Sequence, residues 1–444
     1  MRSNLHTFFH SSFSRLLLAA AFSMVTLTFF GWRAASLNAS AFCRGWPLCL
    51  PIEPLGWLQL LHRLSAGLTG LLLVLVFRKA WREEFQHLLI LPLATLCCIM
   101  FFGQVFVGAR EAVKPAPHLA VLHALASASL WISLLALLFV GAFRSREENR
   151  VYVRHSPRRW KDFLILTKPW IVALLLVTTI AGLVTGYKGL PPLTLVFWTL
   201  LGGALAAGGS SALNQCIDHE LDRHMQRTAD RPLAAGRLTQ AEGLAFGLAL
   251  CVGSYFVLAG LVNLLAAVLS LAGIFYYVLV YSIWLKKATV QNIVIGGGAG
   301  AIPPMVGWAA ATGQLPLAAW ILFTIIFMWT PPHFWALAIV RQKDYERAGV
   351  PMLPVVRGEA ETRRQILLYT VLLVGVSLLL PALHLAGTLY LFSALVLGGG
   401  LLYAAWRVWR VPGNKVAFLM YRWSSYYLLF IFIALMLDAV YRRG

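Results

Sequence analysis

The stretch LTLVFWTLLGGALAAGGSSALNQCIDHELD at residues 193–222 combines two features that decide the fold. Residues 193–213 form a mostly apolar run that is long enough to cross the hydrocarbon core of a bilayer as one helix. The polar end that follows places Asn214, Asp218 and Asp222 four residues apart, which puts the three side chains on one face of a continuing helix. The stretch therefore predicts a membrane-spanning helix that ends in a column of oxygen atoms.

Similar apolar runs recur along the whole chain of 444 residues. Hydrophobic residues make up 59% of the sequence and charged residues only 12%, a composition too apolar for an ordinary soluble domain. We therefore expect an all-α integral membrane protein with about 13 transmembrane helices. The predicted spans are 15–33, 57–77, 87–108, 119–141, 165–186, 193–213, 241–259, 262–282, 290–310, 316–338, 366–387, 389–406 and 423–440.

The formal charge of +20 is explained by membrane topology rather than by a nucleic-acid surface. Basic residues are retained on the cytoplasmic side of membrane proteins. If the N-terminus is cytoplasmic, most of the 37 Lys and Arg residues fall at inner helix ends or in inner loops. We therefore predict a multi-pass protein of the cytoplasmic (inner) membrane, with its N-terminus in the cytoplasm, membrane lipid around it and no nucleic-acid partner.

One long charged segment divides the chain. Residues 143–162 hold a cluster of basic residues together with Pro157, as is typical of a linker on the inner side. Four predicted spans precede this linker, within residues 1–142, and nine follow it, within residues 163–444. We expect a four-helix bundle followed by a nine-helix bundle.

The oxygen column predicts a metal ion and a phosphorylated substrate. Hard cations such as Mg²⁺ take oxygen ligands and bind phosphates through one or two carboxylates. Arg227 and Arg231 follow the column, again four residues apart, where guanidinium groups could hold phosphate oxygens. Lys286 and Asp344 lie at the same predicted membrane boundary. The alternative is a solvated inner loop, but this concentration of charge in a chain with only 17 acidic residues favours a Mg²⁺ and diphosphate site.

The run from Asn214 to Leu233 has the pattern N-x-x-x-D-x-x-x-D-x-x-M-x-R-T-x-x-R-P-L. It resembles the protoheme IX farnesyltransferase (heme O synthase) branch of the ubiquinone-type intramembrane prenyltransferase superfamily, and the resemblance extends over about residues 160–444. Further matching segments are 167–169, 281–287, 291–308, 331–337, 344–345 and 348–354. One departure is Gln215, which stands where many superfamily members carry an aspartate and favours the heme-directed branch.

The resemblance implies a nine-helix bundle around an intramembrane cavity. The implied reaction transfers a farnesyl group from farnesyl diphosphate to a vinyl group of heme B, which gives heme O. Mg²⁺ would bind at Asp218, Asp222 and Asp344, and the implied catalytic groups are these three with Arg227, Arg231 and Lys286. The implied substrate-binding residues are Asn214, Lys168, Thr228, Tyr281, His333 and Tyr345. The rival hypothesis is a prenyltransferase that acts on a quinone precursor.

His333 carries an alternative of its own. As a histidine inside an apolar span it is the candidate to face the porphyrin, because polar residues within a membrane are commonly functional. It could instead only form a hydrogen bond between two helices.

In the front block, His62 and His123 lie at similar predicted depths in the second and fourth spans, as two axial ligands of one heme iron would have to. The block resembles one half of heme A synthase over roughly residues 15–141. The matching segments are 43–49, 62–63, 104–110 and position 123. This resemblance implies a bound heme b and a part in oxidising heme O.

Two departures bear on that oxidation. Gln59 stands where the family tends to carry an acidic residue, and only one four-helix half is present. Two copies of the chain would therefore have to pair as a homodimer to rebuild an eight-helix unit. The other hypothesis is a heme-binding or heme-delivery protein of the membrane.

Cys43 and Cys49 lie in a predicted outer loop, where a disulfide would persist. The sequence leaves a Cys43–Cys49 disulfide and two free thiols open as alternatives.

Overall fold

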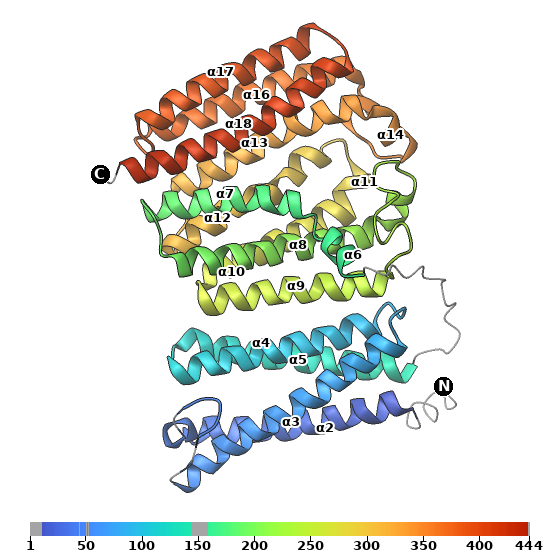
Figure 1. Ribbon diagram of the computed structural model, residues 1–444, viewed down its shortest axis with the longest axis vertical. Helices are drawn as coiled ribbons and strands as arrows, with labels where there is room; N and C mark the ends of the chain where they lie inside the picture. The colour runs from blue at the N-terminus through green and yellow to red at the C-terminus, as the bar shows by residue number, and fades with distance from the viewer. Residues whose placement is uncertain (1–10, 44, 50, 52, 144–158, 443–444) are drawn as a thin grey trace. The chain divides into compact units, whose positions relative to one another are not determined.

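A computed structural model describes residues 11–43, 45–49, 51, 53–143 and 159–442, and every regular element in these residues is a helix (Figure 1). Thirteen of the helices are long and apolar enough to cross a membrane, which confirms the all-α membrane fold. The chain forms two compact units. The first comprises Met1–Pro157 with Gly236–Phe256, and the second comprises Arg158–Ala235 with Val257–Gly444.

The first unit is built from two helical hairpins. Helix α2 packs along α3, and α4 packs along α5. Their bounds are α2 Ser12–Ser36, α3 Pro54–Glu83, α4 Ile90–Val113 and α5 Pro117–Phe143, with a short 3₁₀ turn at Ala39–Phe42. Helix α9, Gln240–Leu261, begins in this unit and ends in the second one. The linker prediction falls mostly on residues 144–158, which lie outside the described residues, so the division at 1–142, 143–162 and 163–444 stays a prediction.

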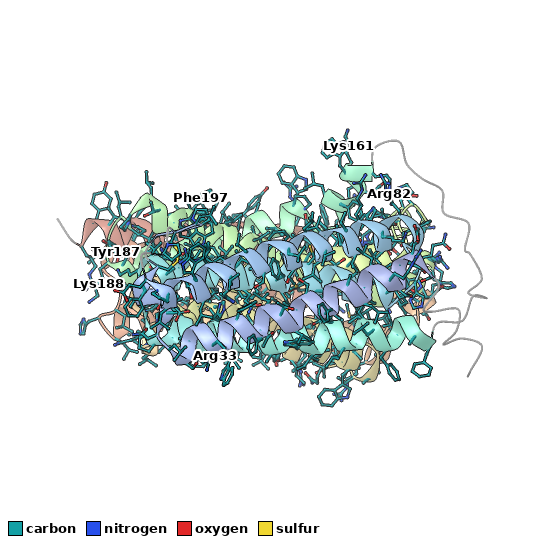
Figure 2. The ribbon with its side chains drawn as sticks, turned by 90° about the horizontal axis from the view of Figure 1, so that it is seen from below. Arg33, Arg82, Lys161, Tyr187, Lys188 and Phe197 are labelled. Carbon is teal, nitrogen blue, oxygen red and sulfur yellow. A yellow bond between two sulfur atoms is a disulfide. The ribbon has the colours of Figure 1, made fainter. Side chains whose placement is uncertain are left out.

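The second unit contains the remaining helices. They are α6 Arg159–Leu166, α7 Pro169–Tyr187, α8 Leu193–Arg223, α10 Leu264–Phe275, a π-helix at Tyr276–Leu285, α11 Lys286–Ala288, α12 Asn292–Thr312, α13 Leu317–Val340, α14 Gln342–Arg347, α15 Leu353–Val356, α16 Gly358–Ala382, α17 Thr388–Arg410 and α18 Asn414–Tyr441. Figure 2 shows Lys161 of α6 and Lys188, just after α7, at opposite ends of this unit. Helices α6 and α7 together therefore lead from one end of the unit to the other.

Glycines let α7 and α12 pack closely. A Cβ at Gly182 would collide with the carbonyl of Pro304, and one at Gly307 would collide with the carbonyl of Thr179. Small residues at such crossings are typical of membrane helices, where close backbone approach replaces the hydrophobic driving force. This contact holds the second half of α7 against α12.

The local structure differs from the sequence prediction at two places near the oxygen column. Helix α8 continues without a break to Arg223, as predicted, but the chain then turns, so the four-residue spacing of Arg227 and Arg231 does not lie on a helix. The reason is local hydrogen bonding, because the hydroxyl of Thr228 donates to the carbonyl of Asp222 at 3.0 Å. The second difference is the π-helix, which no feature of the apolar pattern predicted.

Candidate active site

The oxygen column on α8 is buried. Asn214, Asp218 and Asp222 are 4%, 2% and 3% exposed, which is far below what a solvated inner loop would show. The side-chain amide of Asn214 donates from Nδ2 to Oδ2 of Asp218 at 2.8 Å. Buried carboxylates persist only when they are paired or hydrogen-bonded, so the groups around them decide what this site can bind.

The π-helix supplies one set of partners. Lys286 donates to Oδ2 of Asp218 at 2.5 Å, and the hydroxyl of Ser282 accepts from Nδ2 of Asn214 at 2.9 Å. The Ser282 hydroxyl itself donates to the carbonyl of Tyr277, five residues earlier, at 2.8 Å. Short π-helical segments are rare and occur often at functional sites. Here Ser282 within the π-helix and Lys286 directly after it contact α8.

The loop after α8 supplies a second partner. Arg231 donates from Nη1 to both carboxylate oxygens of Asp222, at 2.9 and 2.7 Å. Thr228, which is buried, ties the loop to the helix end through the carbonyl of Asp222. Arg227 lies close enough to Tyr281 and Tyr345 to interact with them electrostatically. The loop thus returns to the column and directs two guanidinium groups into one region.

Lys168 is a third cationic residue beside the oxygen column, after Lys286 and Arg231. Its side chain donates to Oδ1 of Asn214 at 3.2 Å. Its backbone has φ of 51°, a left-handed conformation that is uncommon for a residue other than glycine and here directly precedes Pro169. Burial, together with the nearby positive charge of Arg231, lowers the pKa of Lys168 to about 7. An anion bound beside Lys168 would restore its proton.

Gln215 holds the turn that carries Lys168. Its Nε2 and the hydroxyl of Ser211 both donate to the carbonyl of Leu166, each at 2.8 Å. Leu166 is the last residue of α6, two positions before Lys168. The departure from the superfamily pattern at Gln215 therefore has a structural role, which sequence reasoning did not find.

The donor set fits a divalent cation at one position. Within the described part of the chain, Oδ1 of Asp218 is buried and has no hydrogen-bond partner. Both oxygens of Asp222 already bind Arg231. Asp344 on α14 binds Arg347 at 3.1 Å, and no group of three His, Cys, Asp or Glu side chains among the described residues could hold a metal. The Mg²⁺ roles of Asp218, Asp222 and Asp344 stay predictions.

His333 is held by α18. Its Nδ1 lies 2.8 Å from the hydroxyl oxygen of Ser424, and that hydroxyl donates to the carbonyl of Tyr421. Nδ1 therefore carries the proton, and Nε2 keeps its lone pair. The ring also stacks on Trp329, with centroids 4.2 Å apart, and lies 4.5 Å from the ring of Tyr421. The predicted cross-helix hydrogen bond is present, and Nε2 takes part in none of the hydrogen bonds of the described residues.

Comparisons with known proteins agree with this site. The model of the UbiA prenyltransferase family matches residues 175–434, a segment that contains the column, the π-helix and His333. The chain belongs to the UbiA prenyltransferase family. The protoheme IX farnesyltransferase of Roseiflexus sp. (strain RS-1) is 40% identical over 97% of this chain and 85% of its own length. That of Trichodesmium erythraeum is 48% identical over 65% of this chain and 91% of its own length.

A solved structure supports the UbiA fold. The structure of a digeranylgeranylglyceryl phosphate synthase covers 64% of this chain and 99% of its own, with a TM-score of 0.55 and 17% identity. At that identity the likeness concerns the fold alone. The chain is therefore a multi-pass membrane prenyltransferase of the UbiA family, as the sequence predicted.

Helices α2 to α5, called the front unit below, precede the residues matched by the UbiA family model, and their two hairpins share one arrangement. Nδ1 of His62 lies 3.3 Å from the carbonyl of Leu27, and Nδ1 of His123 lies 3.2 Å from the carbonyl of Gln104. Each carbonyl belongs to the residue four positions before a glycine that faces the histidine ring, Gly31 in α2 and Gly108 in α4. Phe-x-Gly-x-Arg occurs at both places, 29–33 and 106–110.

This arrangement fixes the chemistry of both imidazoles. A carbonyl oxygen only accepts hydrogen bonds, so Nδ1 of His62 and of His123 must carry the proton, and each Nε2 is left with a lone pair. A histidine held in this way is the usual form of a metal ligand. A side chain at Gly31 would collide with the ring of His62, so glycine there allows the ring its position.

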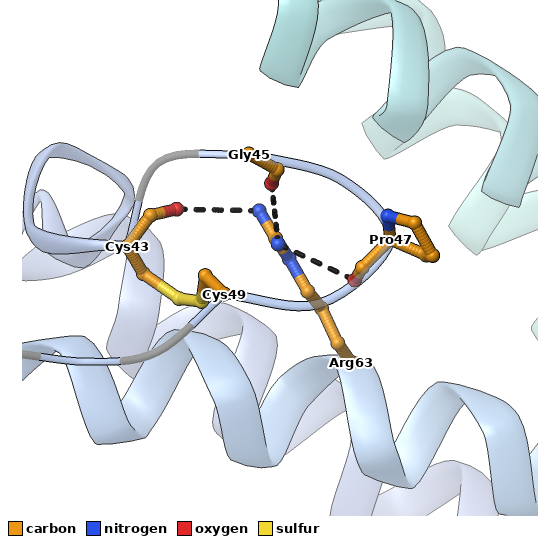
Figure 3. Close-up of a disulfide and its surroundings, with 5 residues drawn as sticks. All are labelled: Cys43, Gly45, Pro47, Cys49 and Arg63. Atoms are coloured by element: carbon orange, nitrogen blue, oxygen red, sulfur yellow. Dashed lines mark hydrogen bonds between the residues drawn. A yellow bond between two sulfur atoms is a disulfide. The ribbon is translucent and has the colours of Figure 1, made fainter.

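Cys43 and Cys49 are joined by a disulfide in the loop above this pair, so the structure adopts the first of the two alternatives (Figure 3). Arg63, the residue after His62, holds the loop. Its guanidinium donates to the carbonyl oxygens of Gly45 at 2.6 Å, Pro47 at 3.4 Å and Cys43 at 3.4 Å. The loop is thereby anchored to the helix turn that presents His62.

Proposed function

We propose that the second unit transfers a farnesyl group from farnesyl diphosphate to a vinyl group of heme B, giving heme O. The observation that carries the proposal is the buried pair Asp218 and Asp222 with three cationic side chains around it, Lys168, Lys286 and Arg231. The excess of positive charge suits a diphosphate. Two relatives that are 40% and 38% identical over nearly the whole chain bear the name protoheme IX farnesyltransferase, which supports heme as the acceptor.

Asp218 is the residue best suited to Mg²⁺, since one of its buried oxygens has no partner in the described structure. Asp222 and Asp344 would contribute to the same role once a diphosphate draws Arg231 and Arg347 away from them. Bound Mg²⁺ would supply further positive charge to the leaving diphosphate. Lys168, Lys286 and the two arginines 227 and 231 would bind the phosphate oxygens directly and stabilise charge as it develops there.

The reaction needs no covalent intermediate with the protein. The C–O bond of farnesyl diphosphate breaks, its electron pair leaves with the diphosphate, and an allylic cation forms. The π electrons of the heme vinyl group form the new C–C bond. Water then adds to the resulting cation and loses a proton, which gives the hydroxyethylfarnesyl group. The chain's contribution is to stabilise the leaving group and to position both substrates.

His333 is the proposed porphyrin contact, because its Nε2 makes no hydrogen bond among the described residues and its ring is fixed by Ser424, Trp329 and Tyr421. Tyr281 and Tyr345 would line the path between the diphosphate and this histidine, since both interact electrostatically with Arg227. Asn214 and Thr228 would keep the column and the loop in place for the substrate. Burial raises the pKa of Tyr345, so it would act there as a neutral hydroxyl.

An acceptor competition tests the proposal. Purified full-length protein with Mg²⁺ and farnesyl diphosphate would be given heme B and an aromatic quinone precursor at equal concentration. We expect heme O as the prenylated product. Prenylation of the quinone precursor alone would favour the rival acceptor and overturn the proposal.

For the front unit we propose heme b binding, in which Nε2 of His62 and Nε2 of His123 would hold the iron. The matched hydrogen bonds of the two histidines favour this over a packing role. His62→Ala and His123→Ala should each remove a low-spin heme spectrum. His118→Ala, an exposed histidine at the start of the same helix as His123, is the matched control and should leave the spectrum unchanged. An unchanged spectrum in His62→Ala would exclude this ligation.

We propose in addition that the front unit takes part in oxidising heme O. It would need an eight-helix unit from two copies, and therefore a homodimer through the front unit. Heme A among the hemes extracted from cells that express the chain would support it, and heme O alone would make the front unit accessory. We also propose the inner membrane with a cytoplasmic N-terminus, which labelling of a cysteine introduced at either terminus would test.

A further inference from the structure

A groove of about 400 Å³ opens on the second unit between α17 and α18. Its lining consists of Leu397 from α17 and, from α18, Leu419, Arg422, Trp423, Tyr426, Tyr427 and Phe430. The α18 residues recur every three or four positions, so they form one face of the helix. No residue of the candidate active site lines this groove.

The groove exists because α17 lacks side chains opposite that face. Residues 398–400 are three successive glycines. A Cβ at Gly400 would meet only the ring of Trp423, at 3.7 Å. The floor is formed by Tyr427, which is 1% exposed and whose hydroxyl lies 2.6 Å from that of Ser377. The groove therefore has a fixed floor and an open side.

Arg422 is the polar group of the groove. It lies eight residues after Asn414, where the span begins, which is about 12 Å along the helix. Its side chain is exposed, and its one hydrogen-bond partner among the described residues is the neutral hydroxyl of Tyr426, at 3.3 Å. An arginine on the outer surface of a membrane helix is costly unless an anion accompanies it.

This part of the chain supplies no such anion. The sequence contains no aspartate or glutamate from Thr362 to Leu437, whereas Arg407, Arg410 and Lys415 lie near the turn that joins α17 to α18. Anionic lipids attract basic residues at a membrane surface. The charge of this end thus complements a lipid phosphate.

The length of the groove also fits a lipid. The twelve residues from Leu419 to Phe430 extend over about 16 Å of helix, close to half of a hydrocarbon core of about 30 Å. Trp423 and Tyr426 are residue types that favour the boundary between headgroups and acyl chains. We propose that the groove binds one anionic phospholipid, with its phosphate on Arg422 and an acyl chain along the face from Leu419 to Phe430.

The test measures lipid bound to full-length protein by native mass spectrometry. Delipidated protein would be titrated with phosphatidylglycerol or with phosphatidylcholine of identical acyl chains. We expect wild-type protein to retain one phosphatidylglycerol that Arg422→Gln binds at least tenfold more weakly. Gly400→Leu, which fills the groove, should weaken the same binding. Arg410→Gln removes a basic residue at the same end but outside the groove lining; it is the matched control and should weaken the binding far less than Arg422→Gln does.

Equal binding of phosphatidylglycerol by wild type and Arg422→Gln would overturn the proposal, and so would equal retention of phosphatidylcholine. A dimer that Gly400→Leu dissociates would show that a second copy of the chain covers the groove, which also overturns it. If Gly400→Leu fails to fold, Arg422→Gln with its control still decides the outcome.

Discussion

Arg231 uses a single nitrogen, Nη1, to bind both carboxylate oxygens of Asp222, at 2.9 and 2.7 Å. Asp222 is 3% exposed, so this contact neutralises a charge that water does not reach. The ion pair between Arg231 and Asp222 therefore holds the loop after α8 against the end of that helix. Both carboxylate oxygens of Asp222 stay bound to Arg231 until another anion, such as a diphosphate, binds that arginine instead.

Removing Arg231 should destabilise the protein. Arg231→Ala leaves the carboxylate of Asp222 buried without its partner, which typically costs about 3–5 kcal/mol. Thermal unfolding in detergent should show a clear decrease in the melting temperature. Lys79→Ala, which breaks the more exposed pair Lys79–Glu83 on α3, is the control and should change stability by about 0.5 kcal/mol or less. Similar melting temperatures for both variants would contradict the account of Asp222.

Asp218→Asn should abolish turnover without unfolding the chain. The substitution keeps the shape of the side chain but removes the negative charge that suits a divalent cation, so kcat should fall by at least about 100-fold. Chelation of Mg²⁺ should have the same effect on wild-type protein. Glu220→Gln changes an exposed carboxylate two residues away on α8 and should leave kcat unchanged. Full activity of Asp218→Asn would remove Asp218 from the metal site.

Gln215→Ala should act through Lys168. It removes one of the two donors to the carbonyl of Leu166, so the turn that carries Lys168 loosens. We expect the KM for farnesyl diphosphate to rise by about tenfold and the KM for heme B to stay unchanged. Thr370→Ala, a buried hydroxyl that bonds only within α16, is the control. An equal change in both KM values would indicate a general structural role for Gln215 instead.

Lys168 predicts a dependence of substrate binding on pH. Its pKa, lowered to about 7 by burial, means that the free site carries this proton below pH 7 and loses it above. Because the protonated form binds a diphosphate better, affinity for farnesyl diphosphate should fall as pH rises through about 7. The arginine of Lys168→Arg stays charged over this pH range. The diphosphate of the substrate changes its own protonation equally with both proteins, so the variant corrects for that change. The ratio of wild-type to variant KM should therefore rise with pH, and a constant ratio would contradict the assignment.

The apolar pattern was sufficient to predict thirteen spans, and helical spacing was sufficient to predict the column at Asn214, Asp218 and Asp222. Both depend on local periodicity, which the sequence displays directly. The return of Arg231 to Asp222 and the π-helix that delivers Lys286 depend on tertiary contacts, for which the sequence had no visible signal.

Two roles were also beyond the reach of spacing arguments. Gln215 was noted only as a departure from a pattern, yet it holds the carbonyl of Leu166. Ser424 was not singled out at all, although it fixes the proton of His333 from a helix about ninety residues away in sequence. Such positioning groups become visible only once the helices are packed together.

The most direct test of the central claim is mass spectrometry of the product formed from heme B. Purified protein would be incubated with Mg²⁺, farnesyl diphosphate and heme B, and the extracted hemes would be compared with those from Asp218→Asn. The account predicts heme O, the mass of heme B increased by one farnesyl group and one hydroxyl, in wild type and none in the variant. Unchanged heme B with the wild-type protein, or heme O formed equally by Asp218→Asn, would contradict it.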